Sequence, residues 1–302
     1  MKRATHAIGV DVGGTKILAG VVTPDGEVLR RHERPTPLDS QVAVLAELEA
    51  AVEELLTDEV AAIGFGVPAP LDLAAGVVFE SVNMPLANVA LRDHMRRRFG
   101  LPVGLDNDAN AAAIGEWRAG VGRGVDDLVM LTLGTGVGGG VISSGRPFRG
   151  ANGRGVELGH VVVVHDGLPC QGICTGRGHL EAYVTGTAAT AAAAEAFGPA
   201  ADAHRLVRLA DEGDETARAI LAAIGRYLGS ALGSFANVFG PELIVVGGGF
   251  GLAGWNHLIP AAEEVLRREA LWPMRDIVRV VPAKLGTAAG LVGAGFVGFE
   301  AA

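Results

Sequence analysis

Two glycine-rich segments decide how this sequence folds: Asp11-Val12-Gly13-Gly14-Thr15-Lys16 near its start and Leu133-Gly134-Thr135-Gly136-Val137-Gly138-Gly139-Gly140 near its middle. Each follows an apolar, strand-like run, at residues 7–10 and 128–133, and each leads into another. One such turn is a weak signal, because glycine also serves ordinary hairpins. Two of them, about half a chain apart, predict two related lobes that hold one polyphosphate from opposite sides, the layout of a phosphoryl-transfer protein.

The composition is that of a globular protein with two cores. The chain has 302 residues, of which 49% are hydrophobic. Its net charge of −9, without a lysine/arginine run, argues against a nucleic-acid or membrane-surface partner, although acidity can also serve solubility alone. No apolar run approaches the ~20 residues of a membrane span, and Asp11 ends the N-terminal apolar stretch, unlike a signal peptide. We therefore expect a cytoplasmic protein.

The spacing of apolar residues predicts an α/β protein that begins with three antiparallel strands. In the first half, strands are expected over 6–10, 16–23, 27–33, 60–66 and 101–105, and helices over 42–55, 88–99 and 106–117. The second half begins in the same way at 127 and then becomes glycine-rich and irregular over 143–178. Beyond it we expect a long buried helix over 220–238, strands over 242–246 and 278–281, and a closing helix over 288–296.

The two halves meet near residues 120–126, where no low-complexity linker occurs, so this boundary is predicted to be a hinge. Residues 1–120 would form a smaller N-terminal lobe, rejoined by the C-terminal helix at 288–302. Residues 121–287 would form a larger C-terminal lobe.

The first glycine turn has the chemistry of a phosphate cradle. At Gly13 and Gly14 the missing side chains let backbone N–H groups approach phosphate oxygens, and the Thr15 hydroxyl adds a donor. Asp11, at the end of a strand, is placed to orient Mg²⁺ through water. The alternative is a tight hairpin beside a solvated aspartate.

The second glycine segment fits the spacing of a dinucleotide fingerprint at Gly134, Gly136 and Gly139. That fingerprint requires a helix immediately afterwards, whereas this sequence continues as a strand. We therefore reject the dinucleotide interpretation. The first turn likewise lacks the lysine-then-threonine order of a nucleoside-triphosphate P-loop.

Along nearly its whole length the chain resembles the ROK family of sugar kinases and regulators, within the actin/hexokinase-like ATPase superfamily. The resemblance implies a two-lobed, ribonuclease H-like α/β fold, each lobe a mixed sheet with helices, around a cleft that closes. It implies ATP-dependent phosphorylation of a hexose or N-acetylhexosamine, and a homodimer. The segments that carry it are 11–16, 107–111, 133–140, 157–160, 180–183, 246–249 and 285–291.

The resemblance also assigns site residues. Asp108 would be the general base that takes the proton of the acceptor hydroxyl, although it could instead be only the N-cap of the helix that follows. Many family members have a tryptophan shortly after the asparagine at position 83, where this chain reads Asn83-Met84-Pro85. The expected sugar-binding residues are Asn83, Asn107, Asp108, Glu157, His160 and Glu181. The expected nucleotide-binding residues are Asp11, Gly13, Gly14, Thr15, Lys16, Gly134, Thr135, Gly136, Gly247, Gly248 and Gly249.

The only two cysteines of the chain suggest a structural zinc site. His160, Cys170, Cys174 and His179 offer four ligands in one glycine-rich stretch. The family usually has three cysteines here, often spaced C-x-C-x4-C, whereas this chain reads C-x3-C-x4-H, so His179 would replace the last one. His165 is a possible substitute, and two free thiols in a metal-free loop are the alternative.

These features favour an enzyme that phosphorylates glucose at the expense of MgATP. Kinases for N-acetylmannosamine, N-acetylglucosamine, fructose or mannose are the alternatives. Polyphosphate is a conceivable donor, since Arg146, Arg149 and Arg154 lie on one loop. A non-catalytic sugar sensor is a further alternative. A repressor is disfavoured, because family repressors carry a helix-turn-helix domain before the first turn, where this sequence has ten residues before Asp11.

Overall fold

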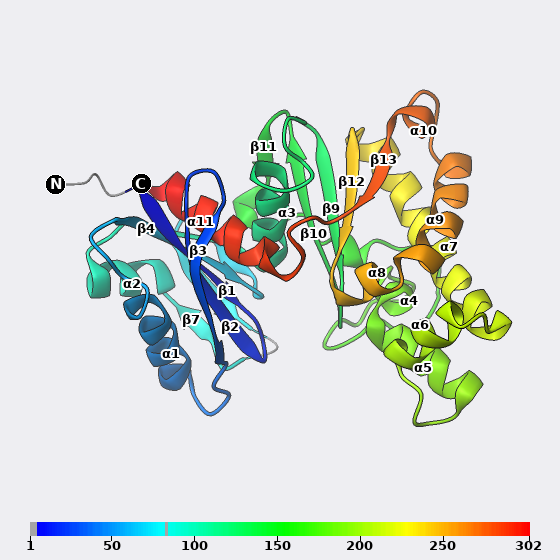
Figure 1. Cartoon of the computed structure of the whole chain (residues 1–302), viewed down its shortest axis with the longest axis horizontal. Helices are drawn as coiled ribbons and strands as arrows, with labels where there is room; N and C mark the ends of the chain where they lie inside the picture. Colours follow the sequence, from blue (N-terminus) through cyan, green and yellow to red (C-terminus); the bar gives the residue numbers. More distant parts are fainter. Residues whose placement is uncertain (1–4, 82–83) are drawn as a thin grey trace.

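The computed structural model describes residues 5–81 and 84–302 and contains two five-stranded sheets (Figure 1). The first sheet has the order β3-β2-β1-β4-β8, and the second has the order β11-β10-β9-β12-β13. In the first sheet, β1 (His6–Val12) pairs antiparallel with β2 (Lys16–Val22), which pairs antiparallel with β3 (Val28–Pro35). On the other side of β1, the parallel strands are β4 (Val60–Val67) and β8 (Val103–Asn107).

The second sheet repeats this plan strand for strand. β9 (Leu128–Leu133), β10 (Val137–Ser143) and β11 (Arg146–Phe148) are antiparallel neighbours, whereas β12 (Leu243–Gly247) and β13 (Arg279–Pro282) run parallel to β9. Each glycine segment therefore forms the first hairpin turn of its own sheet. The two related halves predicted from these turns are confirmed.

A third, small sheet was not expected from the sequence. Its strands are β5 (Leu71–Asp72), β6 (Val77–Glu80) and β7 (Ala87–Val89). The helix predicted from residue 88 is wrong at its start, because Val89 pairs with Val78 and Asn88 has a left-handed φ of 53°. Helix α2 begins only at Leu91 and ends at Phe99.

The other helices follow the predicted order. In the first half they are α1 (Gln41–Glu53) and α3 (Asp108–Arg118). Ser40 caps α1, but Val42, which helical spacing placed on its buried face, is 76% exposed. The second half contains α4 (Glu181–Val184), α5 (Gly186–Phe197), α6 (Ala203–Asp211), α7 (Glu215–Phe239), α8 (Gly249–Ala253), α9 (Trp255–Glu269), α10 (Met274–Ile277) and α11 (Ala289–Ala301). Short 3₁₀ helices lie at Ala151–Gly153, Leu158–His160 and Gly286–Ala288.

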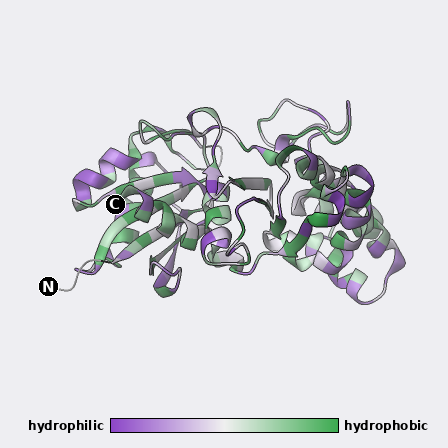
Figure 2. Ribbon diagram, turned by 90° about the horizontal axis from the view of Figure 1, so that it is seen from above, coloured by the Kyte–Doolittle hydropathy of each residue, from purple (hydrophilic) through white to green (hydrophobic). Residues whose placement is uncertain are grey.

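Helix α7 is the predicted long helix, and Gly240 ends it in a left-handed conformation. By length and composition alone it could cross a bilayer, but 56% of its most apolar window is buried inside the protein, as in a core helix. It packs against α9, which the sequence analysis did not assign. Figure 2 shows that hydrophobic residues concentrate in the strands and inner helices, and that hydrophilic residues cover the outer helices.

Helices α3 and α11 lie between the two large sheets (Figure 1). Helix α11, formed by the end of the chain, packs on β1, β4 and β8 of the first sheet, whereas α3 contacts both α11 and β10. Glycines permit this close approach. A Cβ at Gly64 would overlap the carbonyl of Ala294, and one at Gly293 would overlap that of Ala111.

The boundary of α3 differs from the prediction by two residues. Asp106 and Asn107 pair with Gly66 and Val67 as the end of β8, rather than opening the helix. The Asn107 side chain is the N-cap, since it accepts hydrogen bonds from the backbone N–H groups of Ala109 (2.9 Å) and Asn110 (3.2 Å). The alternative that Asp108 serves only as the cap is therefore wrong.

A buried carboxylate joins the two connections between the sheets. Glu116 of α3 is 0% exposed and accepts the N–H of Val121 (3.0 Å), on the connection from α3 to β9. Its other oxygen accepts the N–H of Leu285 (2.6 Å), on the connection from β13 to α11. Both connections between the two sheets therefore donate a hydrogen bond to one side chain at the predicted hinge.

We expect Glu116→Gln to destabilise the protein, because the amide replaces one acceptor with a donor. A buried backbone N–H then loses its partner, at a cost of about 1–3 kcal/mol in the free energy of unfolding. Urea denaturation monitored by circular dichroism measures it. Glu195→Gln, at an exposed position of α5, is the control, and equal stability of the two variants would contradict the assignment.

Candidate functional site

The first glycine turn joins β1 to β2 and is held in place by hydrogen bonds to its carbonyl groups. The Gly13 N–H donates to the Lys16 carbonyl (2.9 Å), and the Thr36 hydroxyl donates to the Gly13 carbonyl (2.6 Å). The Thr36 N–H donates to the Thr15 carbonyl (3.1 Å). These hydrogen bonds, which the turn accepts through its carbonyl groups, fix its conformation. The Lys16 ammonium forms an ion pair with Glu33 (2.8 Å) at the surface.

The Asp11 carboxylate, near the end of β1 just before this turn, lies against helix α11. A Cβ at Gly290 would collide with it, so only glycine fits at that point of the helix. Burial, together with the charge of Asp108 and against an opposing effect of Lys16, raises the pKa of Asp11 to about 7. Asp11 and Asp108, far apart in sequence, are therefore electrostatic neighbours.

Asp108 is the first residue of α3, where the positive end of the helix dipole favours a carboxylate. Burial raises its pKa, and the charge of Glu157 acts in the same direction. Hydrogen bonds from the backbone N–H groups of Ala109 and Asp108 and from the Asn107 side chain oppose this effect. The structure thus brings Asn107, Asp108 and Glu157 together with Asp11.

The second glycine turn borders a cavity of about 460 Å³ in the larger half. Its backbone is tied to the start of α5, because the Gly186 N–H donates to the Gly134 carbonyl (2.8 Å) and the Thr187 hydroxyl to the Thr135 carbonyl (3.0 Å). Gly134 and Thr135 line the cavity with residues that sequence reasoning missed, among them Thr187, Thr190, Asp202, His204 and Phe250. The sequence Thr185-Gly186-Thr187, a capped helix start after a buried turn, was the available signal.

The three glycines at positions 247–249 have two different roles. Gly249 lines the cavity, at the start of α8. Gly247 lies within strand β12, and Gly248 has a φ of 81° and packs so closely on Leu133 that a Cβ would overlap its backbone. Gly247 and Gly248 are not among the residues that line this cavity, and they permit close contact between β12 and β9.

Glu181 connects the second glycine turn to the cysteine-containing segment. Its Oε2 accepts the N–H of Val137 (2.9 Å), and its Oε1 lies 4.0 Å from the Cys170 sulfur. His160, in the 3₁₀ helix that follows Glu157, turns its Nδ1 towards the same sulfur at 3.6 Å. The expected sugar ligand Asn83 lies outside the described residues.

The four predicted zinc ligands form one cluster. Ligand atoms of His160, Cys170, Cys174 and His179 all lie within 4.8 Å of one another. The Nδ1 atoms of the two histidines are 3.3 Å apart, and Nδ1 of His179 is 3.5 Å from the Cys174 sulfur. Burial raises the pKa of the Cys170 thiol to about 11.

The alternative ligand His165 does not join this cluster. Its side chain is 94% exposed and forms an ion pair with Asp166 (3.3 Å).

The chain is similar to proteins of known family and fold. The model of the ROK family matches residues 7–297. The glucokinase of Thermotoga maritima is 36% identical over 305 residues, which cover 95% of each chain. The crystal structure of a ROK family glucokinase from Streptomyces griseus in complex with glucose and AMPPNP is 34% identical, with a TM-score of 0.83, and the match covers 98% of this chain and 99% of that one.

The ROK hexokinase of Thermus thermophilus is 35% identical, with a TM-score of 0.84, and the match covers 98% of both chains. The predicted two-lobed actin-like ATPase fold is thereby confirmed. On the family model and on these relatives, the chain belongs to the ROK family.

Proposed function

We propose that the protein transfers the γ-phosphoryl group of ATP to a hexose, with glucose as the preferred acceptor and glucose 6-phosphate as the product. The observation that carries this proposal is the meeting of Asp11, Asp108 and Glu157 beside a glycine turn, in a chain whose second glycine turn borders a cavity of about 460 Å³. The glucose and AMPPNP bound by the Streptomyces griseus relative support both substrates.

In this proposal the cavity receives the adenosine, and the two glycine turns receive the phosphates. The Gly13 and Gly134 N–H groups, the first of which the sequence assigned to phosphate, are instead used within their own turns, by the carbonyls of Lys16 and Gly136. The turns would offer phosphate oxygens the N–H groups of Gly14, Thr15, Thr135 and Gly136 and the two threonine hydroxyls. Asp11 suits Mg²⁺, because a desolvated carboxylate beside a second carboxylate gains from a nearby cation. Bound Mg²⁺ would neutralise charge on the phosphates.

The sugar would bind through polar groups around Asp108. We assign Asn107, Glu157, His160 and Glu181 to its hydroxyls, together with Asn83 from outside the described residues. The acceptor oxygen bonds to the γ-phosphorus, the bond to the β,γ-bridging oxygen breaks, and ADP leaves. The hydroxyl proton passes to Asp108, whose raised pKa makes it a more effective base near neutral pH.

We further propose that the His160–Cys170–Cys174–His179 cluster holds structural zinc. Ligands about 2.0–2.3 Å from a tetrahedral zinc ion are separated by about 3.3–3.8 Å. The separations of 3.3, 3.5 and 3.6 Å within the cluster match this range. Zinc would fix His160 by Nδ1, which leaves Nε2 for a sugar hydroxyl, and would hold the segment beside Glu181.

Lobe closure and assembly complete the proposal. We infer that residues 1–120 with α11 move against residues 121–287 when substrates bind, about the connections fastened by Glu116. The family resemblance supports a homodimer in the cytoplasm.

A screen of ADP release tests the function directly. Glucose, mannose, fructose and the N-acetylhexosamines are compared as acceptors, with ATP and then polyphosphate as donor. Preference for an N-acetylhexosamine or fructose would favour the alternative kinases. Sugar binding without any ADP release would favour a sensor.

We expect Asp108→Asn to retain the fold and to lower kcat by about 10³-fold, since the amide cannot accept the proton. Steady-state kinetics with circular dichroism measure both properties. Asp93→Asn, at an exposed position of α2, is the matched control. Turnover of Asp108→Asn near that of wild type would exclude Asp108 as the base.

We expect Asp11→Asn to stabilise the ligand-free, Mg²⁺-free protein in a pH-dependent way while abolishing activity. The folded-state pKa of Asp11, about 7, exceeds its unfolded value of 3.8, so wild-type stability is lost as the pH rises between these values. Asn does not titrate, so the variant keeps its stability as the pH rises. Its free energy of unfolding should equal that of wild type near pH 4 and exceed it by about 1–3 kcal/mol at pH 8. Urea denaturation across this range measures it, and a difference that does not change with pH would contradict the assignment.

We expect one zinc ion per chain in freshly purified protein, measured by plasma mass spectrometry. Cys174→Ser should lose zinc, lower the melting temperature and raise KM for the sugar, because His160 and Glu181 lose their support. His165→Ala, outside the cluster, should keep zinc. Metal-free protein whose fold and activity are unaffected by chelators would refute the site.

A further inference from the structure

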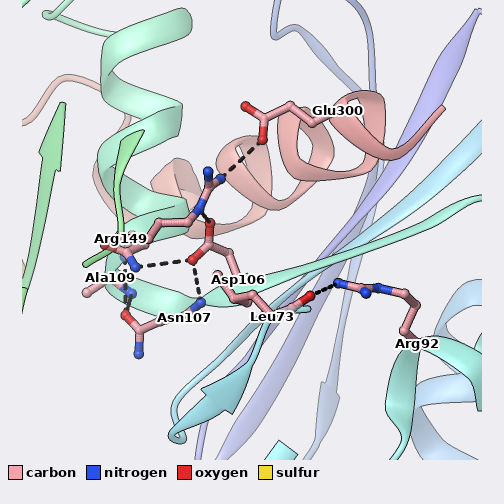
Figure 3. A network of polar contacts seen from close by, with 8 residues as sticks. Leu73, Arg92, Asp106, Asn107, Ala109, Arg149 and Glu300 are labelled. Carbon is pink, nitrogen blue, oxygen red and sulfur yellow. Dashed lines mark hydrogen bonds and ion pairs between the residues drawn. The ribbon is translucent and has the colours of Figure 1, made fainter. Parts of the chain in front are cut away.

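Asp106 is a fully buried carboxylate in the strand that delivers Asp108. It is 0% exposed and lies at the end of β8 (Figure 3). Its Oδ1 accepts the N–H of Asn107 (2.8 Å) and the side-chain amide of Asn110 (3.1 Å), whereas its Oδ2 accepts Nε of Arg149 (2.6 Å). Asp106 therefore holds the turn from strand to helix on both sides of Asp108.

Arg149 reaches this carboxylate from the other half of the chain. It follows β11, the edge strand of the second sheet, and its guanidinium lies between Asp106 and Glu300 of α11 (Figure 3). Its Nη2 donates to the Glu300 carboxylate at 3.1 Å. One guanidinium thus ties the second sheet to the end of β8 and to the last helix.

The rest of the segment after Arg149 also lies on the first half. The Arg154 guanidinium stacks over the ring of Phe79 in β6, 4.5 Å from its centroid. Gly153 packs on Leu73 so closely that a Cβ would contact its side chain. The segment then leads to Glu157, whose charge acts on Asp108. The same stretch therefore begins with the partner of Asp106 and ends with a neighbour of Asp108.

We propose that Arg149 is a positioning residue for phosphoryl transfer, which acts on Asp108 through Asp106. The inference rests on the proposed function, in which Asp108 is the base. Without Arg149 the buried Asp106 carboxylate loses its counter-charge and the partner of its Oδ2, which is strongly unfavourable, and its side chain must either turn or draw water into the site. Both responses disturb the hydrogen bonds to Asn107 and Asn110 that set the start of α3.

The expected consequence is a loss of turnover rather than of binding. A displacement of about 1 Å at the reacting group can lower the rate by about 10²-fold. Arg149 touches none of the groups assigned to the sugar or the nucleotide. Asp106 contacts the sugar ligand Asn107 only through its backbone N–H, while the Asn107 side chain is held separately as the cap of α3, so the affinities should change less than turnover. Lysine cannot replace it fully, because a single ammonium does not reproduce the Nε and Nη2 contacts to two carboxylates.

The test compares kcat and KM of Arg149→Met, Arg149→Lys, Asp106→Asn and the double variant Arg149→Met/Asp106→Asn. Arg149→Met should lower kcat by about 10²-fold and leave KM for hexose and ATP within about 3-fold. The double variant should recover at least about 10-fold of that loss, because an amide at position 106 keeps an oxygen acceptor for Asn107 and Asn110 without a charge to compensate. Arg146→Met, at an exposed arginine of β11, should match wild type.

The recovery separates positioning from mere support of the fold. If Arg149→Met does not fold, Arg149→Lys gives the same comparison, with a reduced kcat at nearly unchanged KM. Arginine variants with wild-type kcat in an active protein, or a double variant no better than Arg149→Met, would overturn the inference alone. A wild-type protein that releases no ADP with any hexose would overturn the proposed function and the inference with it.

Discussion

Helix α11 approaches strand β4 so closely that a methyl group at Gly64 would overlap the carbonyl of Ala294, and it approaches α3 so closely that one at Gly293 would overlap Ala111. Backbone therefore packs on backbone through the centre of the molecule. At this spacing van der Waals contact is continuous, and the helices cannot shift without a clash. The same packing brings Gly290 against the Asp11 carboxylate and fixes α3, whose first residue is Asp108. The geometry of the site follows from this contact.

Helix α3 also carries buried carboxylates at both of its ends. Asp106, just before it, is bound by Arg149, and Glu116, in its last turns, is bound by backbone N–H groups of both chain crossings. A buried carboxylate needs such partners, because its desolvation is costly. Each partner comes from a segment that enters or leaves the second sheet. The closure proposed above would therefore pivot where these carboxylates keep their bonds.

The two related sheets and the Cys/His cluster could be predicted, because short stretches of sequence determine them. The two glycine turns after apolar strands predicted two related sheets, and the Cys/His spacing predicted a cluster that the structure forms.

The small sheet β5-β6-β7 could not be predicted, because its short strands follow loop geometry such as the left-handed Asn88 rather than an apolar period. The start of α3 was placed too early, because β8 ends in polar residues that pair with β4. In the sequence Arg149 is one of three arginines on one loop that make polyphosphate a conceivable donor. In the structure it is held by Asp106 and Glu300, a long-range contact that no local pattern reveals.

The negative charge gathered around Asp108 opposes folding. Asp108 acts on Asp11, Glu157 acts on Asp108, and burial raises the pKa of both aspartates. A fold selected for stability alone would place neutral side chains there, so the carboxylates persist at the expense of the ligand-free state. A divalent cation beside Asp11 and sugar hydroxyls around Asp108 would offset that cost. Substrate binding and the proposed closure of the two halves would then stabilise each other, because the carboxylates that repel one another become the groups that hold the cation and the sugar.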